Sequence, residues 1–234
     1  MTDVRAYLKG NTYPGRGIIL GRSEDNGRSV AVYFIMGRSE NSRNRVFEKT
    51  EDGIRTRAFD PARLTDPSLV IYHPVRAWDG RTIVTNGDQT DTVLEYLQGG
   101  RGFHAAIMSR TFEPDAPNWT PRISGLIHPD GGYLLSIVKN IGGALERPAH
   151  QLFEFSQPIA GLGHFIHTYK TDGDPLPPFG GEPVPVKIAV ANGLEAYAKT
   201  VWDALDADNR VSLYAREINT ATGETREFLI NKHG

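Results

Sequence analysis

Three arginines interleaved with serine and asparagine follow directly on a strongly apolar stretch of the sequence. The segment 37–45 reads GRSENSRNR and comes after the run SVAVYFIM at 29–36. A planar guanidinium group suits oxyanions, and a buried strand holds the loop that follows it in place. The segment is therefore a candidate phosphate site. The alternative is an ordinary solvated loop whose arginines pair with acids such as Glu40 and Glu48.

Two further polar segments carry groups that could assist a reaction. Tyr72 ends an apolar run that begins at Val70. Its hydroxyl can donate to a developing oxyanion, although a core tyrosine with a solvated hydroxyl is the commoner case. The segment 86–91 (NGDQTD) precedes a predicted helix. Its polar groups either cap that helix or contact the polar atoms of a ligand.

A proline-rich segment, 112–123 (FEPDAPNWTPRI), holds the candidate proton-transfer groups. Glu113 and Asp115 lie here in a predicted loop, beside two aromatic residues. A carboxyl group in apolar surroundings has a raised pKa and can exchange protons near neutral pH. The alternative is a pair of solvated loop acids with Arg122 as a partner.

Other kinds of site find little support. The sequence has no cysteine, so thiolate ligands and thiol nucleophiles are excluded. His164 and His167 are three apart, which places them on opposite faces of a predicted strand, and we expect no metal site. If Met1 is removed, Thr2 becomes an N-terminal residue of the kind that serves amidohydrolases as nucleophile. Residues 3–16, however, separate it from the first predicted strand.

The composition argues against two classes of partner. The 234 residues carry 26 Lys and Arg against 28 Asp and Glu, a net charge of −2. Nucleic-acid-binding proteins usually show a strong basic excess instead. The longest apolar run, 30–36, is far shorter than a membrane span. We therefore expect neither nucleic acid nor a membrane as partner and, because residues 1–5 lack the apolar core of a signal peptide, a cytoplasmic protein.

Apolar runs and turn signals predict the elements that must position these groups. Strands are expected at 17–21, 29–36, 54–59, 69–76, 81–85, 122–127, 133–138, 151–156, 163–169, 210–218 and 224–230. Helices are expected at 88–97, 103–112 and 194–205. The order of strands, two helices, strands, one helix and strands favours antiparallel sheets with helices on their outer faces over alternating βαβ units. The predicted class is α+β, in one domain.

Four ordered stretches of the chain resemble the archaeal-type IMP cyclohydrolase family, which also occurs in bacteria. The residues that carry the resemblance are Gly15-Arg16-Gly17 with Gly21, Tyr33 with Gly37-Arg38-Ser39 and Asn44-Arg45, Tyr72 with Asn86-Gly87 and Thr90-Asp91, and Phe112-Glu113 with Thr120-Pro121-Arg122-Ile123. Phe34 stands where the family has an arginine, so a substrate contact is either lost or supplied from elsewhere. The loop before Arg45 is longer than in the family, which leaves open whether Arg43 or Arg45 takes the family's role.

The resemblance implies a fold and an activity. The fold would be a four-layer αββα sandwich similar to N-terminal-nucleophile hydrolases, without that nucleophile. Residues 1–15 would be a lead-in and residues 16–234 a single domain. The activity would be closure of 5-formamidoimidazole-4-carboxamide ribotide (FAICAR) to inosine monophosphate (IMP) with loss of water, the last step of purine synthesis. The substrate would be a small molecule, no metal or organic cofactor is expected, and the family tends to form homo-oligomers.

The chemistry and the resemblance together predict a role for each site residue. Glu113 is expected to move protons, with Asp115 as the alternative. Tyr72 is expected to donate to the formyl oxygen as it gains charge, and Arg45 to add positive potential there. The residues expected to bind the substrate are Arg16 and Arg38 at the phosphate, Asn86, Asp91 and Arg122 at the base and ribose, and Arg43 as the alternative to Arg45.

Two other functions remain open. A non-catalytic purine-nucleotide binding protein would have the same pocket without turnover, and Phe34 is the residue that favours it. An N-terminal-nucleophile-type amide hydrolase would use Thr2.

Overall fold

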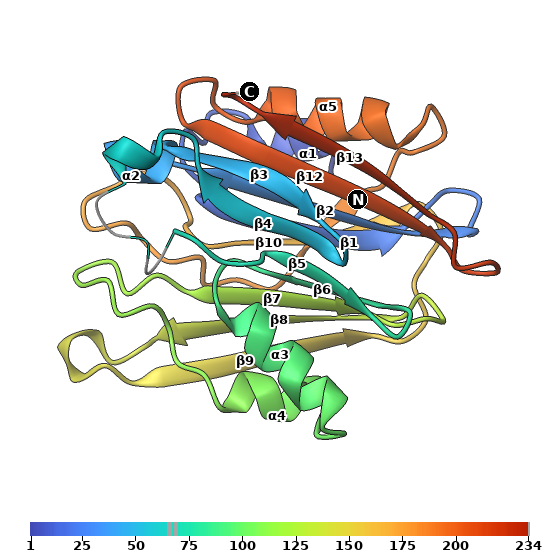
Figure 1. The fold of residues 1–234 in the computed structure, drawn as a ribbon, viewed down its shortest axis with the longest axis horizontal. Helices are drawn as coiled ribbons and strands as arrows, with labels where there is room; N and C mark the ends of the chain where they lie inside the picture. The colour runs from blue at the N-terminus through green and yellow to red at the C-terminus, as the bar shows by residue number, and fades with distance from the viewer. Residues whose placement is uncertain (65–66, 68–69, 234) are drawn as a thin grey trace.

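Two antiparallel β-sheets pack face to face (Figure 1). The computed structural model describes residues 1–64, 67 and 70–233. Within them, one sheet has six strands in the order β11-β10-β1-β2-β12-β13, and the other has seven in the order β3-β4-β5-β6-β7-β8-β9. The first sheet comprises β1 (Arg16–Arg22), β2 (Arg28–Met36), β10 (Leu162–His167), β11 (Val184–Lys187), β12 (Arg210–Asn219) and β13 (Thr225–Asn231). The second comprises β3 (Arg45–Thr50), β4 (Gly53–Ala58), β5 (Val75–Trp78), β6 (Arg81–Thr85), β7 (Arg122–Ile127), β8 (Tyr133–Asn140) and β9 (Pro148–Phe155).

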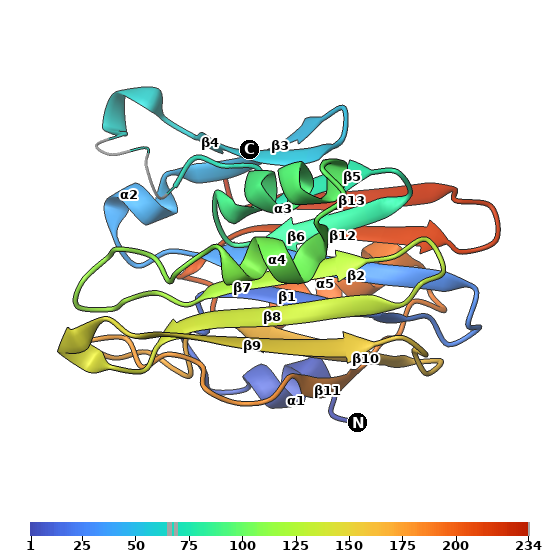
Figure 2. The ribbon, with the colours of Figure 1, turned by 90° about the horizontal axis from the view of Figure 1, so that it is seen from below.

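Helices cover the outer face of each sheet, so the layers run helix, sheet, sheet, helix (Figures 1 and 2). The six-stranded sheet carries α1 (Val4–Leu8) and α5 (Leu194–Ala204). The seven-stranded sheet carries α3 (Gln89–Gln98) and α4 (Gly102–Met108). The remaining helical turns are α2 (Glu40–Arg43), η1 (Pro61–Arg63) and η2 (Gly143–Leu145). Each helix in the described residues is too short or too polar to cross a lipid bilayer.

Apolar clusters hold these layers together. Ile18 and Leu20 of β1 belong to the cluster between the sheets, whereas Ile19 belongs to the cluster under α1 and α5. A further cluster, which includes Ile83 and Val93, joins the seven-stranded sheet to α3 and α4. Because both faces of the central strands are covered, these strands read as continuous apolar runs rather than as alternating ones.

The α+β class and most predicted elements are confirmed. The helix predicted at 194–205 is α5, and the Asp79-Gly80 turn joins β5 to β6 as expected. The strand predicted at 69–76 is wrong for most of its length. Residue 69 lies outside the described residues, 70–74 form turns and bends, and the strand begins only at Val75. Pro74 has no N–H to donate to a ladder, which explains why the apolar run before it does not continue as a strand.

The structure also contains elements that no sequence signal indicated, among them α1, β3 and β11. Each is too short to show a clear period of hydrophobicity. Residues 1–15, predicted as a lead-in, include α1, whose Val4 and Leu8 are buried in the cluster that α5 covers. The start of the chain therefore contributes to the core of the six-stranded sheet.

Candidate active site

A polar pocket of about 330 Å³ lies at the start of β1, the end of β2 and the start of β3. This volume falls within the range typical of small-molecule sites. The residues that line it are Tyr13, Arg16, Met36, Arg38, Ser39, Asn41, Ser42, Arg45, Val70, Glu113, Asp115, Asn118, Tyr169 and Leu176. Of the residues predicted to act, Arg16, Arg38, Arg45 and Glu113 line this pocket together.

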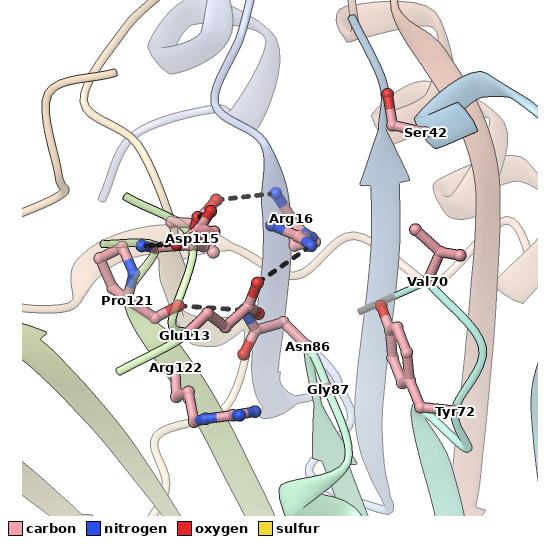
Figure 3. Close-up of polar contacts among 12 residues, drawn as sticks. Arg16, Ser42, Val70, Tyr72, Asn86, Gly87, Glu113, Asp115, Pro121 and Arg122 are labelled. Atoms are coloured by element: carbon pink, nitrogen blue, oxygen red, sulfur yellow. Dashed lines mark hydrogen bonds and ion pairs between the residues drawn. The ribbon is translucent and has the colours of Figure 1, made fainter. Parts of the chain in front are cut away.

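Glu113 is the buried carboxyl group of the pocket (Figure 3). It lies in the loop between α4 and β7 and is only 2% exposed. Asn86 Nδ2 donates to its Oε1 at 3.0 Å, and Arg16 Nη2 lies 3.4 Å from its Oε2. Burial raises the pKa of Glu113, and the charges of Arg16 and Arg122 oppose this rise. The group is therefore shielded from water and retains a raised affinity for a proton.

Asn86 holds Glu113 in place and makes no contact with the pocket. Its Nδ2 also donates to Pro121 O at 3.0 Å, and its Oδ1 accepts from Ile123 N at 2.8 Å and from Gln89 Nε2 at 2.9 Å. With all these hydrogen bonds made, the side chain is fixed between β6 and β7. Asn86, predicted to bind the substrate, therefore lies next to the pocket and bonds to Glu113, but it is not among the residues that line the pocket.

Arg122 lies behind Glu113, outside the pocket. Its Nη1 donates to Asp88 Oδ1 and to Gln89 Oε1, both at 2.7 Å. Gly87 allows this close approach, because a Cβ atom there would lie 2.7 Å from both Arg122 Nη1 and Gln89 Oε1. Arg122 thus adds positive charge near Glu113 without a direct path to a ligand.

Arg45 is a buried cation and Arg16 a partly buried one, and each has one buried nitrogen atom without a hydrogen-bond partner among the described residues. Arg45 is 1% exposed; its Nε donates to Ser42 O at 2.7 Å and its Nη2 to Met36 O at 3.1 Å. Within the described part of the chain, Arg45 Nη1 and Arg16 Nε have no hydrogen-bond partner. Burial lowers the pKa of Arg45. An unpaired buried donor is costly, so these atoms are suited to a ligand that brings acceptors.

Tyr72 stands next to this cluster, although it is not among the residues that line the pocket. Its hydroxyl lies 2.8 Å from the hydroxyl of Tyr33, and it is 7% exposed. In Figure 3 its phenol extends toward the side of the site where Arg16 lies. Both Arg16 and Arg45 interact electrostatically with this phenol.

Asp115 and the C-terminal half of the chain complete the wall of the pocket. Both oxygens of Asp115 accept hydrogen bonds from Thr120, one from its N–H at 2.7 Å and one from its hydroxyl. The Thr120 hydroxyl also bonds to that of Tyr169, whose ring stacks on Tyr13 at 5.8 Å. Sequence reasoning missed Tyr13 and Tyr169, because neither lies in a motif and only the pairing of β1 with β10 brings them together.

Arg38 lies at the exposed end of the pocket. It donates to Asp172 Oδ1 at 2.6 Å and to Gly173 O at 2.8 Å, and its guanidinium lies 5.1 Å from the centre of the Tyr13 ring. The other two predicted binding residues are not in the pocket. Arg43 donates to Gly37 O and Asn209 Oδ1, and Asp91 pairs with Arg76 on the exposed side of α3. The structure therefore places Arg45, not Arg43, in the site.

Phe34, which stands where the family has an arginine, does not line the pocket. It is fully buried on the face of β2 that α5 covers, where its ring lies 5.9 Å from that of Phe165. Alternate residues of a strand point to opposite faces, so a side chain next to Tyr33 points away from the space between the sheets. Thr2 also lies elsewhere, with its backbone paired to Pro185 and Lys187.

His164 and His167, which were not expected to bind a metal, make hydrogen bonds within the fold. His164 Nδ1 lies 2.7 Å from the Tyr133 hydroxyl, and His167 lies between the Tyr7 hydroxyl and the Tyr169 carbonyl. Burial lowers the pKa of His167 to about 4. The described residues contain no cluster of His, Asp and Glu arranged to hold a metal ion.

Comparisons with known proteins agree with one another. The family model for "IMP cyclohydrolase-like protein" matches residues 13–223. A Methanopyrus kandleri protein named IMP cyclohydrolase is 30% identical over 161 residues, which cover 67% of this chain and 75% of that protein. A Halobacterium salinarum protein of the same name is 31% identical over 124 residues, 51% of this chain and 62% of that protein. One from Methanocella arvoryzae is 27% identical over 132 residues, 55% and 64% respectively.

Proposed function

This chain belongs to the IMP cyclohydrolase-like family, and we propose that its pocket closes FAICAR to IMP with loss of water. In the reverse direction this reaction is the hydrolysis of a cyclic amidine. One observation carries the proposal: the buried carboxyl of Glu113 lies in one pocket with Arg16 and Arg45, each of which has an unpaired buried nitrogen within the described residues. This combination suits an anionic substrate that must exchange protons away from water.

The ring closure needs two proton movements. First the carboxamide nitrogen attacks the formyl carbon, a C–N bond forms, and one N–H proton moves to the formyl oxygen to give a carbinolamine. Then the C–O bond breaks, the hydroxyl leaves as water with the proton of the formamido nitrogen, and a C=N bond forms within the closed ring. One group that accepts and returns protons can serve both steps, each by roughly 10²–10⁴-fold.

We assign these transfers to Glu113 rather than to Asp115. Burial raises the pKa of Glu113, so it can hold a proton between the two steps. Its Oε2 has only a long contact to Arg16, at 3.4 Å, and is the oxygen left to meet a substrate. Both oxygens of Asp115, by contrast, are engaged by Thr120. Asp115 would instead contribute negative charge, which raises the pKa of Glu113 further.

The oxyanion that forms at the formyl group requires donors and positive potential. Arg45 lines the pocket, and its Nη1, which has no hydrogen-bond partner among the described residues, is the candidate donor. The phenol of Tyr72 interacts electrostatically with Arg16 and Arg45. A preorganised donor at such a position is typically worth about 10²–10³ in kcat. Tyr72 is not among the residues that line the pocket, so its hydroxyl would reach the formyl oxygen from a position next to them.

The phosphate would bind at the other end of the pocket, on Arg38. This guanidinium is more exposed than those of Arg16 and Arg45, and the adjacent Ser39 also lines the pocket. Arg16 was predicted to contact the phosphate as well, but its place beside Glu113 supports a role at the reacting end. The pocket would then hold the substrate by both ends and fold the formyl group onto the carboxamide, and good orientation of this kind contributes up to about 7–11 kcal/mol.

Turnover by the purified protein tests the proposal. The ultraviolet absorbance of the formylated ribotide should change to that of IMP when the protein is added. Glu113→Gln should lower kcat about 10²–10⁴-fold and leave IMP affinity within a few fold. Asp115→Asn, the matched control two residues away, keeps an oxygen for the Thr120 N–H and should lose less. If Glu113→Gln turned over as fast as the native protein, Glu113 would not be the proton carrier.

The two other functions differ from this one in what they require. A nucleotide-binding protein without activity would bind IMP and leave FAICAR unchanged, but Phe34, which favoured it, lies outside the pocket. An amide hydrolase would need Thr2 as its N-terminal residue, but the Thr2 N–H bonds to Pro185 O at 3.1 Å at the edge of the six-stranded sheet. Detection of intact Met1 by mass spectrometry would rule out this hydrolase.

We infer further that the fold is related to that of N-terminal-nucleophile hydrolases and that the predicted domain, residues 16–234, also includes the packed helix α1. The order of layers and the shared cluster between the sheets support this relation. A homo-oligomer and a cytoplasmic location stay predictions, which size-exclusion chromatography with light scattering and cell fractionation would test.

A further inference from the structure

Tyr33 is a fully buried tyrosine whose hydroxyl meets that of Tyr72. It lies on β2, faces the space between the sheets and is 1% exposed. Its ring stacks on Phe47 at 5.7 Å, with 24° between the planes, so the ring is held in place by packing. The two hydroxyl oxygens are 2.8 Å apart, an ordinary hydrogen bond in which either oxygen can be the donor.

The proposed role of Tyr72 determines which hydroxyl is the donor in the hydrogen bond between Tyr33 and Tyr72. A phenol has one proton, so Tyr72 can donate to a substrate only if it does not donate to Tyr33. We propose that Tyr33 is a positioning residue for ring closure: its hydroxyl donates to the Tyr72 oxygen and so frees the Tyr72 proton for the formyl oxygen. This inference rests on the proposed function and assigns a role to a residue that touches no ligand.

The surroundings of the pair favour this direction. Burial raises the pKa of Tyr33 well above its ordinary value, so Tyr33 keeps its proton and can only act as a neutral partner. The charges of Arg16 and Arg45 act on both phenols and favour negative charge that develops on or beyond Tyr72. Hydrogen bonds in a row polarise one another, so a donation from Tyr33 strengthens Tyr72 as a donor.

The neighbouring strand offers a matched control. Tyr214 of β12 lies directly opposite Tyr33 in the sheet register, is also 1% exposed and belongs to the same cluster. Its hydroxyl donates to Glu227 Oε1 at 2.6 Å instead of meeting Tyr72. Tyr214→Phe therefore removes a buried, hydrogen-bonded hydroxyl from the same core without touching the pair.

The experiment is a double-mutant cycle on turnover of FAICAR. Tyr33→Phe should lower kcat about 2- to 12-fold, the usual worth of one hydrogen bond, with KM and IMP affinity unchanged. Tyr72→Phe should lower kcat by about 10²–10³. Adding Tyr33→Phe to Tyr72→Phe should change kcat less than twofold, because Tyr33 acts only through Tyr72. Tyr214→Phe should leave kcat unchanged, and thermal melting should confirm that all four variants fold.

Each contrary outcome has one meaning. If Tyr33→Phe lowers kcat equally with and without the Tyr72 hydroxyl, or if Tyr214→Phe lowers it as much, the effect comes from packing and the inference is wrong. If Tyr33→Phe is as active as the native protein, the inference is wrong while the proposed function stands. If the native protein does not convert FAICAR at all, the proposed function fails and the inference fails with it.

Discussion

Replacing Asp172 by asparagine should tighten substrate binding. In the structure Asp172 Oδ1 accepts from Arg38 Nη1 at 2.6 Å, and a phosphate on Arg38 would have to displace this carboxylate. Asp172 Oδ1 also accepts from Gly173 N at 2.9 Å. Asparagine keeps an oxygen for that bond, so the substitution removes the competing charge and preserves the turn.

The size of the effect follows from the exposure of the pair. The side chains of Arg38 and Asp172 are 36% and 44% exposed, and ion pairs of this kind are worth about 0.2–1 kcal/mol. Loss of the competitor should therefore lower KM for FAICAR and Kd for IMP about 1.4- to 5-fold, with kcat unchanged. Initial rates and titration calorimetry would measure both, and the difference from the native protein should shrink at high salt.

Asp203→Asn is the control for this experiment. Asp203 pairs with Arg210 at 3.4 Å, and neither residue lines the pocket, so the substitution removes one exposed charge without affecting Arg38. It should leave KM unchanged. If Asp172→Asn left KM the same at low salt, or raised it, the phosphate would not bind at Arg38.

Three further predictions concern Glu113 and the residues that support it. Because Glu113 must be ionised to accept a proton and burial raises its pKa, kcat should fall on acidification at a higher pH than an exposed glutamate would give, and Glu113→Gln should remove this limb of the pH–rate profile. Because the pKa of Glu113 is higher in the folded than in the unfolded protein, protonation of Glu113 stabilises the fold. This contribution is complete below the pKa of an unfolded glutamate and is lost as the pH rises through the folded pKa. Chemical denaturation should therefore show that the stability of the native protein falls relative to that of Glu113→Gln over this pH window. Gly87→Ala places a Cβ atom 2.7 Å from both Arg122 Nη1 and Gln89 Oε1, which form a hydrogen bond with each other. It should cost about 1–3 kcal/mol and lower Tm by roughly 2–12 °C in calorimetry, while Gly27→Ala, with ordinary contacts, should not.

The sequence predicted those parts of the site that local pattern controls. Arg45 belongs to the polar segment 37–45 that follows the apolar run 29–36, and Arg16 belongs to the stretch Gly15-Arg16-Gly17 that resembles the family, so local sequence marked both. Glu113 was found because it lies in a proline-rich segment beside aromatic residues and in a stretch that resembles the family. Burial of Glu113 itself was not predictable, since it depends on Asn86 and on contacts between segments distant in the chain.

Other parts depend on register and on distance in the chain. Asp91 lies close to Asn86 in sequence, but one turn of α3 carries it round to Arg76 on the exposed side. Phe34 is adjacent to Tyr33, yet it points to the opposite face of β2. Tyr169 joins the wall only through the pairing of β10 with β1, which no local pattern specifies. Motif matches therefore located the pocket, whereas the direction of each side chain required the structure.

The groups that would act on FAICAR are mounted on different sheets. Arg16 begins β1 and Arg38 follows the end of β2, both strands of the six-stranded sheet, whereas Arg45 begins β3 of the seven-stranded sheet and Glu113 lies in the loop that leads into β7 of that sheet. The separation between these two sets is set by the thickness of the apolar layer, which includes Ile18. Since packed interiors compress little, this layer works as a spacer of fixed width. Substitutions that change the side-chain volume in this layer would change the distance between the two sets of groups. Residues that do not contact the substrate can therefore affect the rate of catalysis.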